Sequence, residues 1–325
     1  MREISSSLKE NLKSCNQLLK QRYNSIKDFG KEELKKLIQA EIGQISIAAK
    51  EAKQDFQAIT GVDGSINTLG GNYPHYITLL QSLAKNSMDR EEEIFLDNIF
   101  SPLLEADREE ILTKAKKDKI SPAEAADKIK NRELAALEVQ AAKNSILNYQ
   151  PEVILLDGSL IRYRSQATKE WKSLVELALE TDTILVGIIE EIGSDKIIEN
   201  LSSKLPKSMR RMYDRELLFG LLEQGEMIKT EGFKTGLKKA FLRSSKDPGV
   251  IGIDMLTEQS DQLDKIANLV YDLTPENGRG IPIWIDIVDE QVRISHKMME
   301  ALVDEYIDPA LKKQLINTKR SDRVY

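Results

Sequence analysis

The tetrapeptide Asp-Gly-Ser followed by an aliphatic residue occurs twice, beginning at Asp63 and at Asp157. Each aspartate follows a short apolar run, residues 58–62 and 153–156, and such runs predict buried strands. One Asp-Gly pair is ordinary turn chemistry, because aspartate can hydrogen-bond the backbone two residues on. Two copies with the same flanking pattern favour a functional site, since both carboxylates could converge on one metal ion. The small residues beside them would let a cation and phosphate oxygens approach closely.

Composition narrows the kind of metal site. Cys15 is the only cysteine, and His75 and His296 are the only histidines. A zinc site built from thiolates or imidazoles is therefore not expected, and we interpret both histidines as surface or boundary residues. Carboxylate oxygens are the ligands that Mg²⁺ and Mn²⁺ accept. The sequence predicts one of these two ions as the cofactor.

A third carboxylate lies on the helix that leads into the second aspartate. Ser121 and Pro122 predict the start of this helix, with serine as the N-cap and proline in the first turn. Glu138 stands between apolar and small residues, where a charge is costly unless something pairs with it. Glu133 is the competing acid and is more readily solvated. A plain surface position for Glu138 is an equal alternative.

The last predicted helix offers further acids, Asp286, Asp289 and Glu290. Helical spacing places Asp289 beside the apolar stripe and Glu290 further out, while Asp286 lies one turn before Asp289. The helix dipole also favours a solvated acidic turn near a helix N-terminus. For the acids of this helix, a role as metal ligand and a role as a solvated surface acid are equal alternatives.

The chain has 325 residues, and we find no long-period repeat or low-complexity linker. We predict a helical arm (1–57), one domain (58–310) and a C-terminal tail (311–325). Strands that alternate with helices indicate an α/β domain with a mixed sheet. A hairpin is expected to turn at Gly70-Gly71. Further strands are expected at 153–156, 183–189 and 250–254, and helices at 88–117, 121–148, 166–180, 194–203, 213–225, 260–271 and 282–306.

Charge is distributed unevenly along the chain. Lys and Arg total 47 against 53 Asp and Glu, a net charge of −6, but residues 204–246 hold 11 basic against 5 acidic residues. Basic residues interleaved with phenylalanines suit single-stranded DNA, whereas a solvated basic helix face is the equal alternative. The predicted DNA-binding residues are Lys204, Lys207, Arg210, Arg211, Lys234, Lys238, Lys239 and Arg243.

Two other classes of function are not expected. The longest strongly apolar stretch, 184–189, is too short to cross a bilayer, and the N-terminus mixes charges with serines, so we expect a cytoplasmic protein without a membrane partner. Residues 232–238 have the wrong spacing for a phosphate-binding loop of an ATPase. Any ATP-driven movement would come from a partner.

Three segments together resemble the NurA nuclease family: residues 61–65, residues 137–160 and residues 214–226. The resemblance covers roughly residues 55–300. It implies an RNase H-like mixed sheet flanked by helices, and a Mn²⁺- or Mg²⁺-dependent site in which Asp63, Glu138 and Asp157 are ligands. It also implies 5′→3′ exonuclease and single-strand endonuclease activity, a homodimer, and a hexameric HerA-like ATPase partner in the resection of DNA ends.

The chain departs from the family at the fourth ligand. Many members carry an Ala-His pair early in the last helix, where this chain has Val288-Asp289. Aspartate can supply the oxygen ligand instead, so the expected site is Asp63, Glu138, Asp157 and Asp289. A lysine often found after the central strand is also missing.

These features favour a nuclease in which two ions clamp the attacking and leaving oxygens of a phosphodiester. A catalytically weak or inactive dimeric DNA-binding adaptor of the same fold is the second hypothesis. A glycoside hydrolase that uses Asp63 and Asp157 is the third. An aromatic content of only 6% weakens the third hypothesis, because sugars commonly stack on aromatic rings.

Overall fold

A computed structural model describes residues 4–50, 56–88, 93–231 and 236–316. The chain divides into two compact units. The first, called the arm unit, combines Met1–Ala52 with Ile189–Ile281. The second, called the carboxylate unit, combines Lys53–Ile188 with Pro282–Tyr325. The predicted division into arm, domain and tail stays a prediction.

The sheet of the carboxylate unit has the strand order β6-β5-β2-β3-β4. Strands β2, β3 and β4 form an antiparallel meander, and β5 and β6 run parallel to β2. The strands are β2 (Ile59–Gly70), β3 (Tyr76–Asn86), β4 (Ile94–Phe100), β5 (Val153–Asp157) and β6 (Ile184–Ile189). The predicted hairpin at Gly70-Gly71 is confirmed, since Gly70 pairs with Tyr76 at its end. The prediction of helix from residue 88 is wrong over β4, because pairing with β3 overrides the local polar composition.

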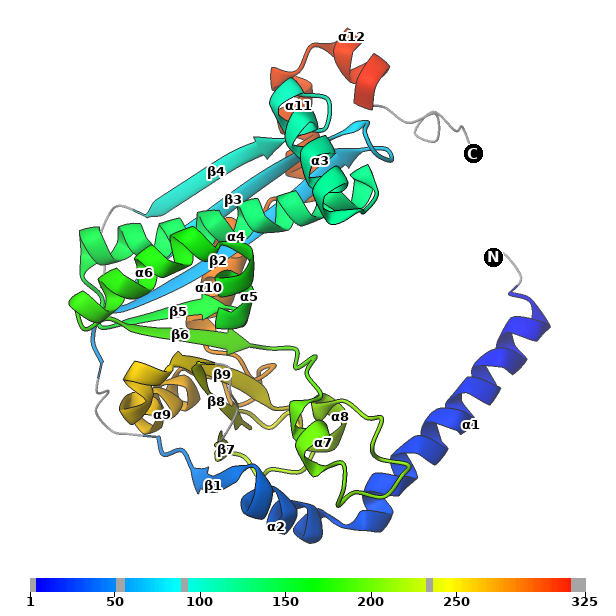
Figure 1. Cartoon of the computed structure of the whole chain (residues 1–325), viewed down its shortest axis with the longest axis vertical. Coiled ribbons are helices and arrows are strands. Elements are labelled where there is room, and N and C mark those ends of the chain that lie inside the picture. The colour runs from blue at the N-terminus through cyan, green and yellow to red at the C-terminus, as the bar shows by residue number, and fades with distance from the viewer. Residues whose placement is uncertain (1–3, 51–55, 89–92, 232–235, 317–325) are drawn as a thin grey trace. The chain divides into compact units, whose positions relative to one another are not determined.

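Helices cover both faces of this sheet. The helices are α3 (Glu105–Asp118), α4 (Pro122–Tyr149), α5 (Leu160–Gln166), α6 (Thr168–Glu180), α10 (Ile283–Val292), α11 (His296–Tyr306) and α12 (Pro309–Leu311), followed by a π turn, Lys312–Ile316. Helix α4 begins as predicted, with the Ser121 hydroxyl accepting from the Glu124 N–H at 3.1 Å. It lies along β2, β3 and β4, while α10 packs on β2 and β3 (Figure 1). A Cβ added at Gly61 would meet α10 and one at Gly64 would meet α4, so the two helices cover opposite faces.

The prediction of one helix from residue 282 to 306 is wrong, because the chain breaks between α10 and α11. The backbone N–H of Ile294 donates to the Ser65 hydroxyl at 2.9 Å, and its carbonyl accepts from the Asn67 amide at 2.7 Å. Ser295 then caps α11 by accepting from the Met298 N–H at 3.1 Å. Two side chains of β2 therefore bind the backbone groups that would have continued the helix.

The arm unit contains an antiparallel sheet of order β1-β7-β8-β9. Its elements are α1 (Ser6–Phe29), α2 (Lys31–Glu41), β1 (Gly43–Ile47), α7 (Lys196–Leu201), α8 (Asp214–Leu218), β7 (Glu226–Thr230), β8 (Leu237–Leu242), β9 (Ile251–Leu256), a 3₁₀ turn (Thr257–Gln262) and α9 (Leu263–Leu273). The expectation of helix to residue 57 is wrong, because residues 43–47 pair with β7. A Cβ at Gly43 would lie 1.9 Å from the Lys229 carbonyl oxygen, so only glycine allows this close approach.

Helix α1 is attached to the arm unit near its C-terminal end. The Arg22 guanidinium donates to both carboxylate oxygens of Glu216 at 2.8 Å and to the Arg211 carbonyl at 2.9 Å. No residue between Ser6 and Phe29 is buried, and Leu8, Leu12, Leu18 and Leu19 are at least half exposed. Polar contacts therefore contribute to holding α1 in place.

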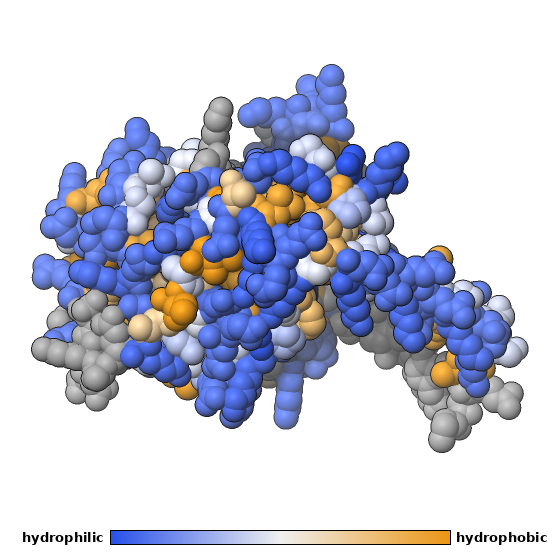
Figure 2. Space-filling model, turned by 90° about the horizontal axis from the view of Figure 1, so that it is seen from below, coloured by the Kyte–Doolittle hydropathy of each residue, from blue (hydrophilic) through white to orange (hydrophobic). Residues whose placement is uncertain are grey.

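Within the described ranges, no helix is long and apolar enough to cross a membrane. The face in Figure 2 is mostly hydrophilic, with hydrophobic side chains gathered in separate patches.

Candidate active site

The two aspartates of the repeated tetrapeptide lie on neighbouring parallel strands. The register of β2 and β5 pairs Val62 with Leu156, so Asp63 and Asp157 follow at the same level. Strand β5 ends at Asp157, whereas β2 continues to Gly70. Beyond this level, β2 therefore has no β5 residue beside it. Side chains can approach this edge from both faces of the sheet.

Glu138 approaches from the α4 face. Its side chain is almost completely buried, with 1% of the residue exposed. A Cβ added at Gly64 would lie 2.7 Å from the Glu138 Oε1 atom, so the second residue of the first tetrapeptide must be small. The carboxylate forms an ion pair with the Arg162 guanidinium, which comes from α5. A buried charge at position 138 is thus paired by Arg162, a residue that no sequence motif singles out.

Asp289 lies on α10, the helix on the other face. Its side chain is 33% exposed and binds Arg293 at 2.7 Å, whereas the side chain of Glu290 is 76% exposed. Asp63 points to the same face, because the cross-strand pair Asp63 and Leu83 shares one side of the sheet and Leu83 packs against Val288 of α10. Asp286 is half-buried on the first turn of the same helix.

The carboxylates interact electrostatically. Burial raises the pKa of Asp63 to about 7, and repulsion from Asp157 and then Asp289 adds to the rise. Burial also raises the pKa of Glu138 to about 8, in spite of the attraction from Arg162, and repulsion from Asp63 and Asp157 contributes. A carboxylate close to other carboxylates favours its neutral form. A cation placed among them would relieve both the burial and the repulsion.

The donor set fits a divalent cation that prefers oxygen ligands. All four groups are carboxylates, and Gly64 leaves the space in which Glu138 lies. In the parts of the chain that the structure describes, however, no three acidic, histidine or cysteine side chains are arranged to hold a metal ion. Glu138 is bound to Arg162 instead. The chemistry of the site thus suits Mg²⁺ or Mn²⁺, and one of its ligands is engaged by an arginine.

Arg162 has a defined setting. Its guanidinium lies 4.5 Å from the ring centre of Tyr163. The buried Tyr163 donates its hydroxyl to the Asp157 carbonyl at 2.7 Å, and its ring stacks on Trp171 with a centroid distance of 6.3 Å. Helix α5 is therefore fixed to the end of β5. The only sequence signal for Arg162 is its position five residues after Asp157, early in a helix that follows the turn.

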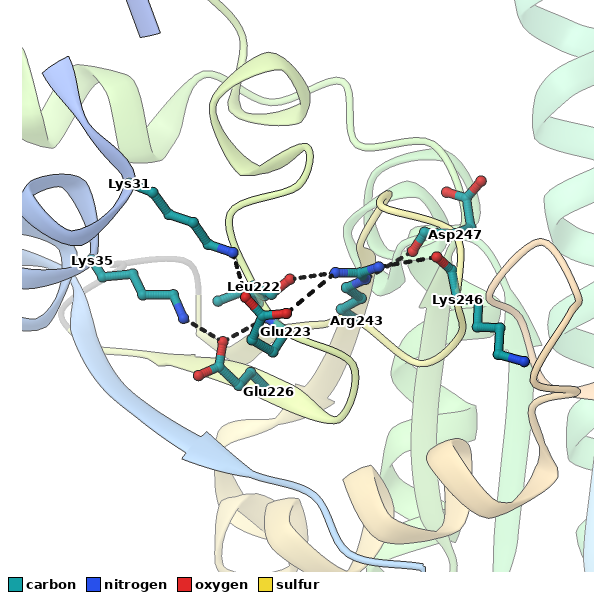
Figure 3. A network of polar contacts seen from close by, with 8 residues as sticks. All are labelled: Lys31, Lys35, Leu222, Glu223, Glu226, Arg243, Lys246 and Asp247. Carbon is teal, nitrogen blue, oxygen red and sulfur yellow. Dashed lines mark hydrogen bonds and ion pairs between the residues drawn. The ribbon is translucent and has the colours of Figure 1, made fainter. Parts of the chain in front are cut away.

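Several of the predicted DNA-binding residues make contacts within the arm unit. Figure 3 shows Arg243 donating to the carbonyl oxygens of Leu222, Lys246 and Asp247, at 2.8, 3.0 and 3.0 Å. Lys239 pairs with the buried Asp254 at 3.0 Å. Lys238 donates to the Thr230 carbonyl at 2.8 Å. These side chains stabilise the turns and strands around β8.

The other predicted DNA-binding residues are more open. Lys204 forms an ion pair with Glu41, and the Arg210 Nε atom donates to the Leu205 carbonyl at 2.9 Å. Lys207 and Arg211 are exposed. Lys234 lies outside the described residues. A role of this set in DNA binding stays a prediction.

The acidic residues of segment 214–226 have structural roles. Asp214 is fully buried and accepts from the N–H groups of Ile197 and Ile198 at 3.0 and 3.1 Å, and from the Ser194 hydroxyl at 2.6 Å. It therefore caps the start of α7. Glu216 binds Arg22, and Glu226 binds Lys35 at 2.6 Å. This segment joins α1 and α2 to the rest of the arm unit.

A mixed sheet flanked by helices, with aspartates at the same level of two neighbouring parallel strands and a glutamate on the helix that covers one face, defines an RNase H-like α/β protein. The NurA domain model matches residues 57–294. The chain belongs to the NurA family. The resemblance and the fold class predicted from the sequence are both confirmed.

One solved structure agrees with the fold, and two others give weaker similarity. The crystal structure of the NurA nuclease from Sulfolobus solfataricus is similar over 95% of this chain and 98% of that chain, with a TM-score of 0.60 and 12% identity. Human endonuclease V, as its catalytic domain, covers 85% of this chain and 95% of its own, with a TM-score of 0.38 and 16% identity. Ciona intestinalis endonuclease V in complex with DNA covers 83% and 95%, with a TM-score of 0.36 and 14% identity. The comparison with curated proteins gives no match.

Proposed function

We propose that this protein is a divalent-metal-dependent DNA nuclease that hydrolyses phosphodiester bonds. The observation that supports this most is the arrangement of four carboxylates: Asp63 and Asp157 lie at the same level of neighbouring strands, with Glu138 and Asp289 on the helices that cover the two faces, and repulsion among them raises the pKa of Asp63 and Glu138. Carboxylates that repel one another are stabilised when a divalent cation binds among them and neutralises their charge. Membership of the NurA family points to the same chemistry.

In this proposal Asp63, Glu138, Asp157 and Asp289 hold Mn²⁺ or Mg²⁺. The bound ions would activate water and stabilise charge on the phosphodiester oxygens. Asp63 and Asp157 come from neighbouring strands, so their backbone positions are fixed by the sheet. Glu138 binds from the α4 face, and its burial excludes bulk water from that side. Asp289 supplies the oxygen ligand that replaces the histidine of many family members.

Labelled single-stranded DNA, incubated with Mn²⁺, Mg²⁺ or EDTA, tests the proposal. We expect cleavage by the wild type with a divalent ion, none in EDTA, and at least a roughly hundredfold loss in Asp63→Asn. Glu290→Gln is the matched control, because it removes a carboxylate from an exposed position on α10. Cleavage that survives Asp63→Asn at the wild-type rate would refute the site assignment.

The second candidate is a DNA-binding adaptor of the same fold without turnover. Its specific support is the Glu138–Arg162 ion pair, together with the lack of a metal-ready group of three ligands among the described residues. The same assay separates the two functions. DNA binding without cleavage, with each metal ion tested, would support the adaptor.

We further propose that the nuclease works in the cytoplasm on single-stranded or resected DNA ends, with 5′→3′ exonuclease and single-strand endonuclease activity. A homodimer that acts with a HerA-like hexameric ATPase completes this proposal. Among the predicted DNA-binding residues, we would first replace the exposed group Lys204, Lys207, Arg210 and Arg211. Removing one charge that binds a phosphate should reduce the slope of the logarithm of the binding constant against the logarithm of the salt concentration by about one. Co-purification with such an ATPase and light scattering of the purified chain test the partner and the dimer.

A further inference from the structure

Arg162 is the positively charged group in contact with Glu138. It pairs with the most deeply buried of the four acids, and its charge also interacts with Asp63. A guanidinium at this position neutralises part of the negative charge that a divalent cation would neutralise. Metal and arginine therefore compete for the same carboxylate.

The setting of Arg162 allows the side chain to leave while the backbone stays. Tyr163 fixes α5 through its hydrogen bond to the Asp157 carbonyl and its stacking on Trp171. The Arg162 side chain itself is 34% exposed, against 2% for Glu138. Its buried Nε atom has no hydrogen-bond partner among the described residues. The guanidinium is thus only partly satisfied by Glu138, and part of the Arg162 side chain is open to solvent.

A guanidinium in this position has a second suitable partner. Arginine binds phosphate through two parallel N–H···O bonds, a geometry that it shares with carboxylate binding. A phosphodiester that reaches the carboxylates at the end of β5 comes within reach of α5, because α5 starts three residues after Asp157. An arginine released from Glu138 would meet that phosphate.

We propose that Arg162 exchanges partners. It holds Glu138 while the site lacks a cation, and it binds a backbone phosphate of the nucleic acid once a divalent cation takes Glu138. Arg162 is then a substrate-binding residue that the occupied metal site releases, so metal binding and DNA binding strengthen each other. This inference rests on the proposed function.

DNA affinity without turnover tests the exchange. Fluorescence anisotropy of a labelled oligonucleotide is measured in EDTA and in Ca²⁺, which serves as a non-cleaving divalent ion. In the wild type, Ca²⁺ should tighten DNA binding. In Arg162→Gln we expect most of that tightening to be lost, so that its dissociation constant in Ca²⁺ is about tenfold higher than that of the wild type. Arg164→Gln, on the same helix, is the control for loss of one positive charge, and Arg162→Lys should fall between the two. Tryptophan fluorescence establishes that each variant is folded.

Replacing the partner of Arg162, Glu138, tests the exchange from the other side. An ion pair with a purely structural role would not affect DNA binding in EDTA. Glu138→Gln keeps the volume of the side chain but replaces the carboxylate that holds Arg162 with an amide. In EDTA this variant should bind DNA about tenfold more tightly than the wild type, because the arginine is already released. The double variant Glu138→Gln/Arg162→Gln should lose the gain. Glu290→Gln reports how much tightening follows from removing any one negative charge.

The outcomes separate the inference from the function on which it rests. If the wild type neither cleaves nor binds DNA with any divalent ion, both are overturned. If the wild type cleaves DNA but Arg162→Gln keeps the full gain from Ca²⁺, only the exchange is overturned. If the tightening in Glu138→Gln survives in the double variant, or equals that in Glu290→Gln, charge alone explains it and the exchange is again refuted.

Discussion

Replacing Asp63 with asparagine should stabilise the metal-free protein at neutral and alkaline pH. The pKa of Asp63 rises from an ordinary 3.8 to about 7, first through burial and then through repulsion from Asp157. The folded state therefore favours the protonated acid. The stabilisation from that proton is complete below about pH 4 and is lost as the pH rises through about 7. At pH 8 the wild type carries the full cost of the buried charge, which Asp63→Asn lacks.

The size of the effect follows from the two pKa values. The difference between 3.8 and about 7 corresponds to about 4 kcal/mol of unfolding free energy at 25 °C, which is an upper value for the gain at pH 8. The gain should shrink as the pH falls from 8 to 4, because the wild-type acid becomes protonated in the folded state. The side-chain oxygen of the introduced asparagine can still accept the hydrogen bond from the Gly64 N–H, so little else changes.

Urea denaturation in EDTA, followed by tryptophan fluorescence, measures this gain. Both tryptophans, Trp171 and Trp284, belong to the carboxylate unit, so the signal reports on the unit that holds the site. Mn²⁺ should stabilise the wild type by about 3 kcal/mol at a hundredfold excess over its dissociation constant, and Asp63→Asn far less. Glu290→Gln should stay within about 0.5 kcal/mol of the wild type. An Asp63→Asn variant that is less stable than the wild type at pH 8 in EDTA would refute the electrostatic account.

Three further substitutions have defined outcomes. Gly64→Ala should push Glu138 aside, because the new Cβ would lie 2.7 Å from its carboxylate. We expect the unfolding free energy, measured by urea denaturation, to fall by about 1–3 kcal/mol, and Mn²⁺ binding, measured by calorimetry, to weaken. Unchanged Mn²⁺ binding would contradict this expectation. Gly43→Ala should detach β1 from β7 through a 1.9 Å clash with the Lys229 carbonyl, seen as rapid proteolysis near residues 43–47; resistance equal to wild type would count against this pairing. Arg22→Gln should speed hydrogen exchange in α1, because it removes the guanidinium that binds both carboxylate oxygens of Glu216; unchanged exchange would show that other groups hold the helix.

Local patterns were sufficient to predict the strands and the helix that carry three of the four acids. Short apolar runs preceded Asp63 and Asp157, and Ser121-Pro122 marked the start of α4. Local patterns do not predict β1, because its stability comes from pairing with β7, which is distant in sequence. They do not predict β4 either, because its pairing with β3 overrides a polar local composition. The break after α10 was missed for a similar reason, since the groups that bind Ile294 belong to β2.

The site was harder to predict than the fold. The cost of a buried charge at Glu138 implied a partner, but the chain has 47 basic residues and their spacing alone does not single out Arg162. Burial and proximity decide that pair, and neither can be read from the sequence. The same holds for Lys239 and Arg243, whose charges suggested DNA binding and whose side chains contact Asp254 and backbone carbonyls.

The anchoring of Tyr163 has a consequence for the rate at which a cation can bind to the carboxylates. With its hydroxyl on the Asp157 carbonyl and its ring on Trp171, the backbone of α5 does not have to move for Arg162 to let go of Glu138. Only rotations about side-chain bonds are needed, and in partly exposed residues these take picoseconds to nanoseconds, whereas loop and domain motions extend to milliseconds. Loading of the site would then be limited by diffusion of the ion and the loss of its hydration water. A stopped-flow trace should accordingly contain a single phase whose rate rises linearly with ion concentration.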